Sequence, residues 1–178
     1  ARRLSDKLLS RLGITDFELV SSQVVEPLTE RGNRAKRGRY EYKYVQVADG
    51  IPLSSGDPDS TGCTVAIDDR GVVEARLTRL ELGESKIVNS RVMTLDGVLA
   101  VLQKKLAAAG LVKDSIVKEI SFEYMSVEDP ETYNSTVFPC WRFCIATTAT
   151  LEQYGEYEND IIINAVTGEF YAVTNRYE

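Results

Sequence analysis

Alternating apolar and polar residues, the pattern typical of β-strands, recur along most of this chain and constrain its fold more than any other feature. Tyr40, Tyr42 and Tyr44 stand at alternate positions, and a similar alternation runs over 116–124. Turn-forming residues separate such segments, most densely over 48–62, where we expect a long loop. The pattern predicts strands at 17–25, 40–45, 63–67, 72–82, 116–124, 137–148, 157–164 and 169–174.

Two segments have helical periodicity instead. Leucines at spacings of four predict a short helix over 3–12, with Gly13 as its C-terminal cap. A second helix is predicted to begin after Thr94, whose side chain we expect to act as the N-cap, and to end at Gly110. Because an apolar stripe must be buried, we expect each helix to cover one face of a sheet. The stripe of the second helix consists of Leu95, Val98, Leu99, Leu102 and Leu106.

Two hairpin sequences suggest that the chain contains an internal repeat. VAIDDRGVVEARL in the first half and IIINAVTGEFYAV in the second both run from apolar residues into an Asp or Asn, pass a glycine turn and leave as a strand. The predicted elements follow the same order in each half, with chance similarity of two hairpins as the alternative. We therefore expect an α+β fold of two tandem units, 1–92 and 93–178, each a helix packed on an antiparallel β-sheet.

The absence of histidine limits the chemistry that this chain can perform. With no histidine among 178 residues, Ser-His-Asp and Cys-His nucleophiles and His-ligated zinc are excluded. We therefore expect a protein that is not an enzyme, while chemistry by carboxylates or a thiol stays open. The formal net charge of −6 argues against a nucleic-acid partner, because neutralising phosphates requires an excess of Lys and Arg. We expect no cofactor and no metal.

The segment FPCWRFC, residues 138–144, contains two of the three cysteines. On a strand, Cys140 and Cys144 would lie roughly 13 Å apart, whereas a disulfide requires Cα atoms about 4.4–6.8 Å apart. We therefore expect these two thiols to be unbridged to each other and free of metal, packed as small apolar side chains. A bond from Cys63 to one of them is the alternative.

Alternation along this strand places Trp141 on one face with Phe143 and Ile145, and Arg142 on the other face. We expect Trp141 to be largely buried against the second helix, and the Arg142 face to be partly solvated or salt-bridged. Aromatic residues at alternating positions are most often core, but exposed together they would form a binding surface. The candidate binding residues are Trp141, Arg142, Tyr124 and Tyr171.

A second candidate site is the basic run RGNRAKRGR over 31–39. Arg34, Lys36 and Arg37 could bind an anionic polymer or headgroup. A solvated loop tip between two strands is the alternative, because the run lacks interleaved aromatic residues and the chain as a whole is acidic.

The second half resembles PepSY-like domains, in which a helix packs on an antiparallel sheet that ends in a hairpin. The resemblance is carried by FPCWRF at 138–143, a Pro-x-Trp strand, and by IINAVTGEFY at 162–171. It covers about 94–171 well and the first half weakly. In this respect the chain is similar to the C-terminal part of YycH/YycI-type regulators and related lipoproteins of Gram-positive bacteria. The cysteine pair around Trp141 departs from the family pattern.

This resemblance implies a non-catalytic, extracytoplasmic regulatory module that binds or restrains another envelope protein, such as a peptidase or a sensor kinase. Because the sequence starts at Ala1 rather than Met, we expect a mature fragment, from which a signal peptide or a lipid anchor could have been removed upstream. The protein would then be membrane-anchored or secreted. Two other functions remain open: a structural or carbohydrate-binding protein of the cell envelope, and an enzyme that uses a carboxylate or a thiol.

Overall fold

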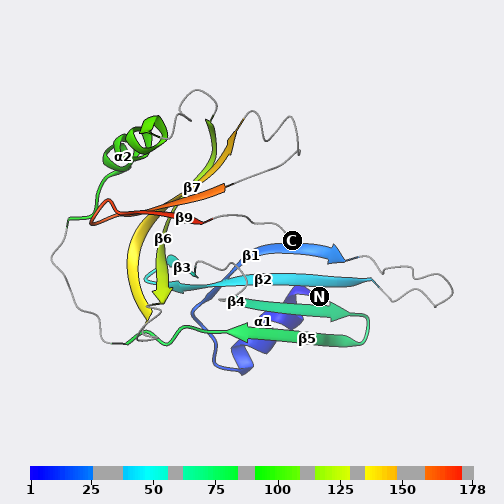
Figure 1. The fold of residues 1–178 in the computed structure, drawn as a ribbon. Coiled ribbons are helices and arrows are strands. Elements are labelled where there is room, and N and C mark those ends of the chain that lie inside the picture. The colour runs from blue at the N-terminus through cyan, green and yellow to red at the C-terminus, as the bar shows by residue number, and fades with distance from the viewer. Residues whose placement is uncertain are drawn as a thin grey trace. The chain divides into compact units, whose positions relative to one another are not determined.

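The computed structural model divides the chain into two compact units, Ala1–Gly83 and Glu84–Glu178 (Figure 1). Unit 1 contains α1 (Arg2–Arg11), β1 (Phe17–Val25), β2 (Arg39–Ala48), β3 (Ile51–Ser55), β4 (Gly62–Asp68) and β5 (Gly71–Thr78). Unit 2 contains α2 (Leu95–Ala108), β6 (Ser115–Glu128), β7 (Ser135–Thr147), β8 (Asn159–Asn164) and β9 (Phe170–Val173). The structure describes residues 1–25, 38–55, 62–83, 91–108, 115–128, 135–147 and 159–173.

Helix α1 ends as its sequence predicts. Gly13 has a φ of 70°, a left-handed conformation in which a side chain would be strained. The N–H of Gly13 donates to the carbonyl of Ser10 at 3.1 Å, and the N–H of Ile14 donates to the carbonyl of Leu9 at 3.0 Å. These two bonds form a Schellman motif, which satisfies carbonyl groups that the helix itself leaves unpaired. The predicted glycine cap is confirmed.

The sheet of unit 1 is antiparallel in the order β1-β2-β4-β5, and its core lies where α1 meets it. Leu9 of α1 belongs to the same buried cluster as the strand residues Tyr42, Tyr44, Cys63, Val65 and Ile67. The hydroxyl of Tyr44 also bonds to Ser5 at 2.7 Å and to Asp6 at 3.1 Å. Both apolar packing and this buried polar contact therefore attach α1 to the sheet.

Part of the loop predicted over 48–62 is a strand. Val47 and Ala48 of β2 pair with Pro52 and Ile51 of β3, so the two strands are joined by a two-residue turn. Asp49 and Gly50 have φ angles of 51° and 75°. Positive φ at both positions defines the turn that suits a tight hairpin, and Asp-Gly is one of its strongest sequence signals.

Unit 2 has a four-stranded antiparallel meander, β6-β7-β8-β9, with α2 packed on one face. The hydroxyl of Thr94 accepts a hydrogen bond from the N–H of Gly97, which confirms the predicted N-cap. The predicted end at Gly110 lies outside the described residues. Four of the five residues of the predicted stripe, Val98, Leu99, Leu102 and Leu106, pack with Phe143, Ile145 and Ile163 of β7 and β8. The fifth, Leu95 at the start of the helix, is 37% exposed.

The two hairpin turns that the sequence singled out use the same device. The side-chain oxygen Oδ1 of Asp68 accepts a hydrogen bond from the N–H of Arg70 at 2.8 Å, at the turn between β4 and β5. Oδ1 of Asn164 accepts from the N–H groups of Val166 and Thr167 at 2.9 and 3.0 Å, between β8 and β9. In both hairpins an Asp or Asn side chain therefore substitutes for a backbone acceptor.

The predicted fold class, α+β with two tandem helix-plus-sheet units, is wrong. The described residues form nine strands and only two helices, so the fold is mostly β. The reason is the number and length of the strands: β6 extends from Ser115 to Glu128, beyond the predicted 116–124, and β3 occupies part of the predicted loop. In addition, β6 and β7 pair with each other along their whole length, from Ser115 opposite Thr147 to Glu128 opposite Ser135. Strand pairing rather than helix packing therefore organises the fold.

Candidate functional site

The four candidate binding residues all lie in unit 2, but they do not form one site. Tyr124 on β6 and Trp141 on β7 share the face on which α2 packs. Arg142 on β7 and Tyr171 on β9 belong to the opposite face, because Ile162 of β8 pairs with both. The pleat of the strands separates the two pairs, so each face must be considered by itself.

On the α2 face, Trp141 is partly buried. It packs against the cluster formed with α2, and its indole Nε1 donates a hydrogen bond to the carbonyl of Met93 at 3.1 Å. Phe122 on the neighbouring strand meets its ring nearly edge-on, with ring centroids 5.1 Å apart at an interplanar angle of 62°. These contacts fix the orientation of the indole while part of its surface stays open to solvent.

An apolar surface runs along β6 beside Trp141. Strand β6 borders β7, and the buried α2 cluster is centred on β7 and β8, so β6 side chains on this face are only partly covered. Val117 is 38% exposed and Ile120 is 39% exposed, and Phe122 and Tyr124 are half-buried. We call these four residues the β6 strip. The strip is a partly exposed apolar row on the same face as the ordered indole of Trp141.

On the opposite face, Arg142 is buried at 9% exposure in a network with two carboxylates. Its Nε donates to Oε1 of Glu123 on β6 at 2.5 Å, and its Nη1 donates to Oδ2 of Asp160 on β8 at 2.7 Å. Burial lowers the pKa of this guanidinium, but the two carboxylates outweigh burial and hold the pKa above its ordinary value. The prediction of a salt-bridged face is confirmed, and Arg142 connects three strands rather than facing solvent.

Tyr171 lies on the same face as Arg142 and is partly buried. Its ring stacks on Phe138 at a centroid distance of 5.4 Å and an interplanar angle of 29°. Burial raises the pKa of its hydroxyl, with Glu169 adding to the effect. Tyr171 therefore packs at the border of the buried cluster on this face.

All three cysteines are buried, and none of them forms a disulfide with another. Burial, with a further contribution from the negative charge of Glu123, raises the pKa of Cys140 to about 12. Burial also raises the pKa of Cys63. A thiol with such a pKa is not a nucleophile at neutral pH, because the reactive species is the thiolate. The packing role predicted for Cys140 and Cys144 agrees with this burial.

Other predicted features can be placed only in part. Arg34, Lys36 and Arg37 lie outside the described residues. Within the parts of the chain that the structure describes, no group of three or more Cys, Asp or Glu residues is placed to hold a metal ion. Among these described residues, no helix is long and apolar enough to cross a membrane.

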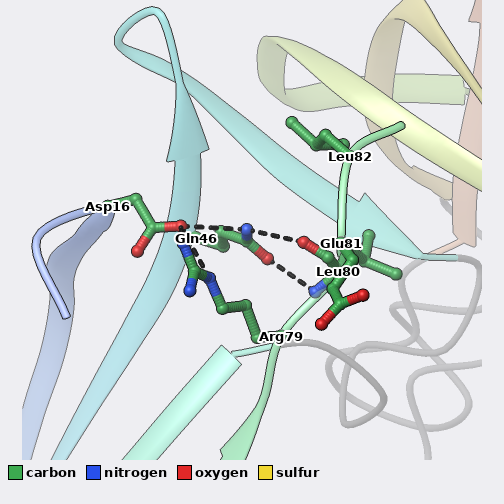
Figure 2. A pocket seen from close by; sticks show the side chains of 6 residues that line it. All are labelled: Asp16, Gln46, Arg79, Leu80, Glu81 and Leu82. Carbon is green, nitrogen blue, oxygen red and sulfur yellow. Dashed lines mark hydrogen bonds and ion pairs between the residues drawn. The ribbon is translucent and has the colours of Figure 1, made fainter. Parts of the chain in front are cut away.

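Sequence reasoning missed a polar pocket in unit 1, shown in Figure 2. Arg79 and Gln46 both donate to Oδ2 of Asp16, at 3.1 Å each. The Gln46 amide also makes two bonds to the backbone of Leu80, which fasten the segment after β5 to β2. Because these residues are 30 to 63 positions apart, no local pattern could have predicted the contact. The pocket is lined by Asp16, Gln46, Arg79, Leu80, Glu81 and Leu82.

The second carboxylate oxygen of Asp16 distinguishes this pocket. Oδ1 is buried and has no hydrogen-bond partner among the described residues, and Figure 2 shows it outside all the drawn bonds. A donor group entering the pocket, of about 410 Å³, could bond to it. However, Asp16 already neutralises Arg79 and holds Gln46, so the arrangement serves first to fix the chain segment after β5.

The structure describes a mostly-β, two-unit protein with a partly exposed apolar strip on β6, and comparison with known proteins adds information on the fold alone. No protein-family model matches the chain, and no curated protein matches it. The chain is similar to the crystal structure of an uncharacterized protein from Eubacterium rectale ATCC 33656, with a TM-score of 0.60 and 19% identity. The match covers 96% of this chain and 54% of the other, so this chain spans about half the length of that protein. At this identity the likeness concerns the fold alone.

Proposed function

We propose that this chain is a non-catalytic, regulatory module that binds another protein, and that the β6 strip beside α2 is its contact surface. The observation that carries the proposal is the partial exposure of Val117 and Ile120 next to Trp141 and Phe122. Removing apolar surface from water is favourable by about 25 cal/mol per Å² of buried apolar area, so covering these side chains would stabilise a complex. A partner would therefore gain most by covering this strip.

The orientation of Trp141 favours the same surface. Its hydrogen bond to the carbonyl of Met93 and its edge contact with Phe122 hold the indole in one position before any partner arrives. A side chain that is already ordered loses little conformational entropy on binding. Tryptophan is also among the residues that contribute most to binding free energy at protein interfaces. We therefore assign Trp141 the role of anchor.

The location and the partner class of the proposal rest on the resemblance of the second half to PepSY-like domains. That resemblance implies action outside the cytoplasm, on an envelope protein such as a peptidase or a sensor kinase. Fractionation of cells that produce the full-length protein tests the location. A carbohydrate ligand is the competing outcome, and binding to purified peptidoglycan distinguishes it from binding to a protein.

The strip can be tested with a matched pair of substitutions on one strand. Ile120→Glu places a charge on the β6 strip, whereas Ile116→Glu places the same charge on the opposite face of β6, where Ile116 is 49% exposed. The tagged variants and the unaltered chain would be incubated with detergent-solubilised envelope protein, and the captured proteins identified by mass spectrometry. We expect a partner that the unaltered chain and Ile116→Glu retain and that Ile120→Glu loses.

Fluorescence gives a second readout, because Trp141 is the only tryptophan in the chain. A tryptophan-free, purified fragment of the captured partner should shift the emission of Trp141 on titration, since covering the indole removes water from it. Retention of the partner by Ile120→Glu, or equal loss in both variants, would contradict the proposal. Capture by peptidoglycan in place of protein would replace it with the carbohydrate-binding function.

A further inference from the structure

Strand β5 forms an outer edge of the sheet in unit 1. It pairs with β4 on one side, and among the described residues no strand pairs with its other side (Figure 1). Val73 and Leu77 are 44% and 45% exposed. An edge strand of this kind presents unpaired N–H and C=O groups, which can pair with a strand from another molecule.

The sequence of β5 is complementary to itself about Ala75. When two copies of an antiparallel strand are centred on this residue, Glu74 of each lies opposite Arg76 of the other. Val73 falls at an irregularity of the β4–β5 register, between Val72 and Glu74, so the charged residues carry the argument. The two charged pairs meet on one face of the joined sheets. We propose that β5 pairs with β5 of a second copy of this chain, forming a two-fold dimer.

Charge determines the register of this pairing. Charged residues on an edge strand commonly prevent association, but here Glu74 and Arg76 have opposite signs and stand on the same face of the strand. A slip that brings residue 74 opposite residue 74, or residue 76 opposite residue 76, places like charges opposite each other and is unfavourable. Only the register centred on Ala75 satisfies both charges.

The carboxylate of Glu74 is already positioned for this role. It bonds to Nε of Arg76 at 2.7 Å and to Nη1 of Arg39 on β2 at 3.2 Å. Its orientation on the sheet face is therefore established before a second copy arrives. The other outer strand of unit 1, β1, carries Glu18 as its single charge and has no such complementary pair.

The contact is small, because it involves one strand of eight residues from each copy. Interfaces of this size are weak and reversible, so the dimer should appear as concentration rises. It is independent of the β6 strip, and either proposal can fail without the other.

Sedimentation equilibrium of the whole chain over a concentration series tests the dimer. In a dimer of E74R, the new arginine of each copy lies opposite Arg76 of the other copy. In a dimer of R76E, the new glutamate of each copy lies opposite Glu74 of the other copy. The two-fold symmetry makes each unfavourable contact occur twice per dimer. Each single variant should raise the dissociation constant of the dimer by about tenfold or more. An equimolar mixture of E74R and R76E should form a heterodimer, because every charge then meets its opposite. Glu18→Arg on β1 serves as the control and should leave the dissociation constant unchanged.

The mixture arm separates loss of association from loss of folding, since an unfolded variant could not pair with its counterpart. Dimer in the unaltered chain, loss in each single variant and recovery in the mixture together support the proposal. A wild-type chain that stays monomeric at every concentration overturns it. So do single variants that dimerise as well as the wild type, or a mixture that stays monomeric.

Discussion

Replacing Arg142 by methionine should destabilise unit 2 more than any single substitution at its surface. Methionine keeps the length and the apolar stem of arginine but removes the guanidinium that bonds to Glu123 and Asp160. The side chains of all three residues are at least nine-tenths buried. After the substitution, two carboxylates would remain buried on one sheet face without their shared counter-charge.

The magnitude follows from the geometry. With charges about 4 Å apart and an effective dielectric constant of about 20, each ion pair contributes roughly 4 kcal/mol of attraction. The cost of taking the charges out of water offsets most of this gain, so the network as a whole stabilises little. Removing one member, however, leaves that cost uncompensated. We therefore expect Arg142→Met to lower the free energy of unfolding by about 3–5 kcal/mol.

The assay is urea unfolding followed by circular dichroism, with a triple variant as the matched comparison. Replacing all three residues by apolar ones, Glu123→Leu, Arg142→Met and Asp160→Leu, removes every charge from the network. Since no unpaired charge remains, this variant should recover at least about 2 kcal/mol relative to Arg142→Met alone. The reasoning is refuted if Arg142→Met costs less than about 1 kcal/mol, or if the triple variant is the less stable of the two.

Three further outcomes are expected. Burial raises the pKa of Cys140 to about 12 from an ordinary 9.0, so between these values the thiol stays protonated in the folded chain and ionises in the unfolded chain. The wild type should therefore lose stability relative to Cys140→Ala as the pH rises above 9.0, by up to about 1.4 kcal/mol per pH unit. Urea unfolding at a series of pH values measures this loss. Gln46→Ala removes the bonds to Leu80 and should cost about 1–3 kcal/mol in thermal unfolding, whereas Gln23→Ala, at an exposed bond, should cost less than about 0.5 kcal/mol; equal costs would contradict the fastening role. Trp141→Ala should cost about 2–4 kcal/mol by urea unfolding, below the upper range for a fully buried aromatic residue, and a loss under about 1 kcal/mol would show that its packing on α2 is unimportant.

Local features of this fold could be predicted from the sequence because each depends on neighbouring residues. Gly13 ends α1 because a glycine after an amphipathic segment readily adopts positive φ. Thr94 caps α2 for an equally local reason. The Asp49-Gly50 turn carried a comparable signal, and the strand β3 was missed because Pro52 and the serines after it indicated a loop.

Features that depend on distant contacts could not be predicted. The stripe of α2 indicated that the helix is buried, but not that only Val98 and Leu102 become fully buried. The predicted fold class was wrong because the strands are longer than the local pattern indicated, as β6 is from Ser115 to Glu128. Alternation correctly placed Arg142 and Trp141 on opposite faces of β7. The partners of Arg142, Glu123 and Asp160, could not be predicted, because they depend on how β6 and β8 align with β7. That register includes an irregularity between Val117 and Glu119, which no sequence pattern indicated.

The two faces of the unit 2 sheet depend on each other through strand register. Arg142 on β7 bonds to Glu123 on β6 and to Asp160 on β8, so it ties the central strand to both neighbours. A slip of β6 by one residue would turn every side chain of the β6 strip to the opposite face. Such a slip would also move Glu123 away from Arg142 and leave buried charges unpaired, which is strongly unfavourable. The buried network therefore specifies which side chains of β6 lie beside Trp141. It follows that Ile120→Glu should weaken partner binding with little loss of stability, whereas Arg142→Met should weaken binding only by destabilising the fold.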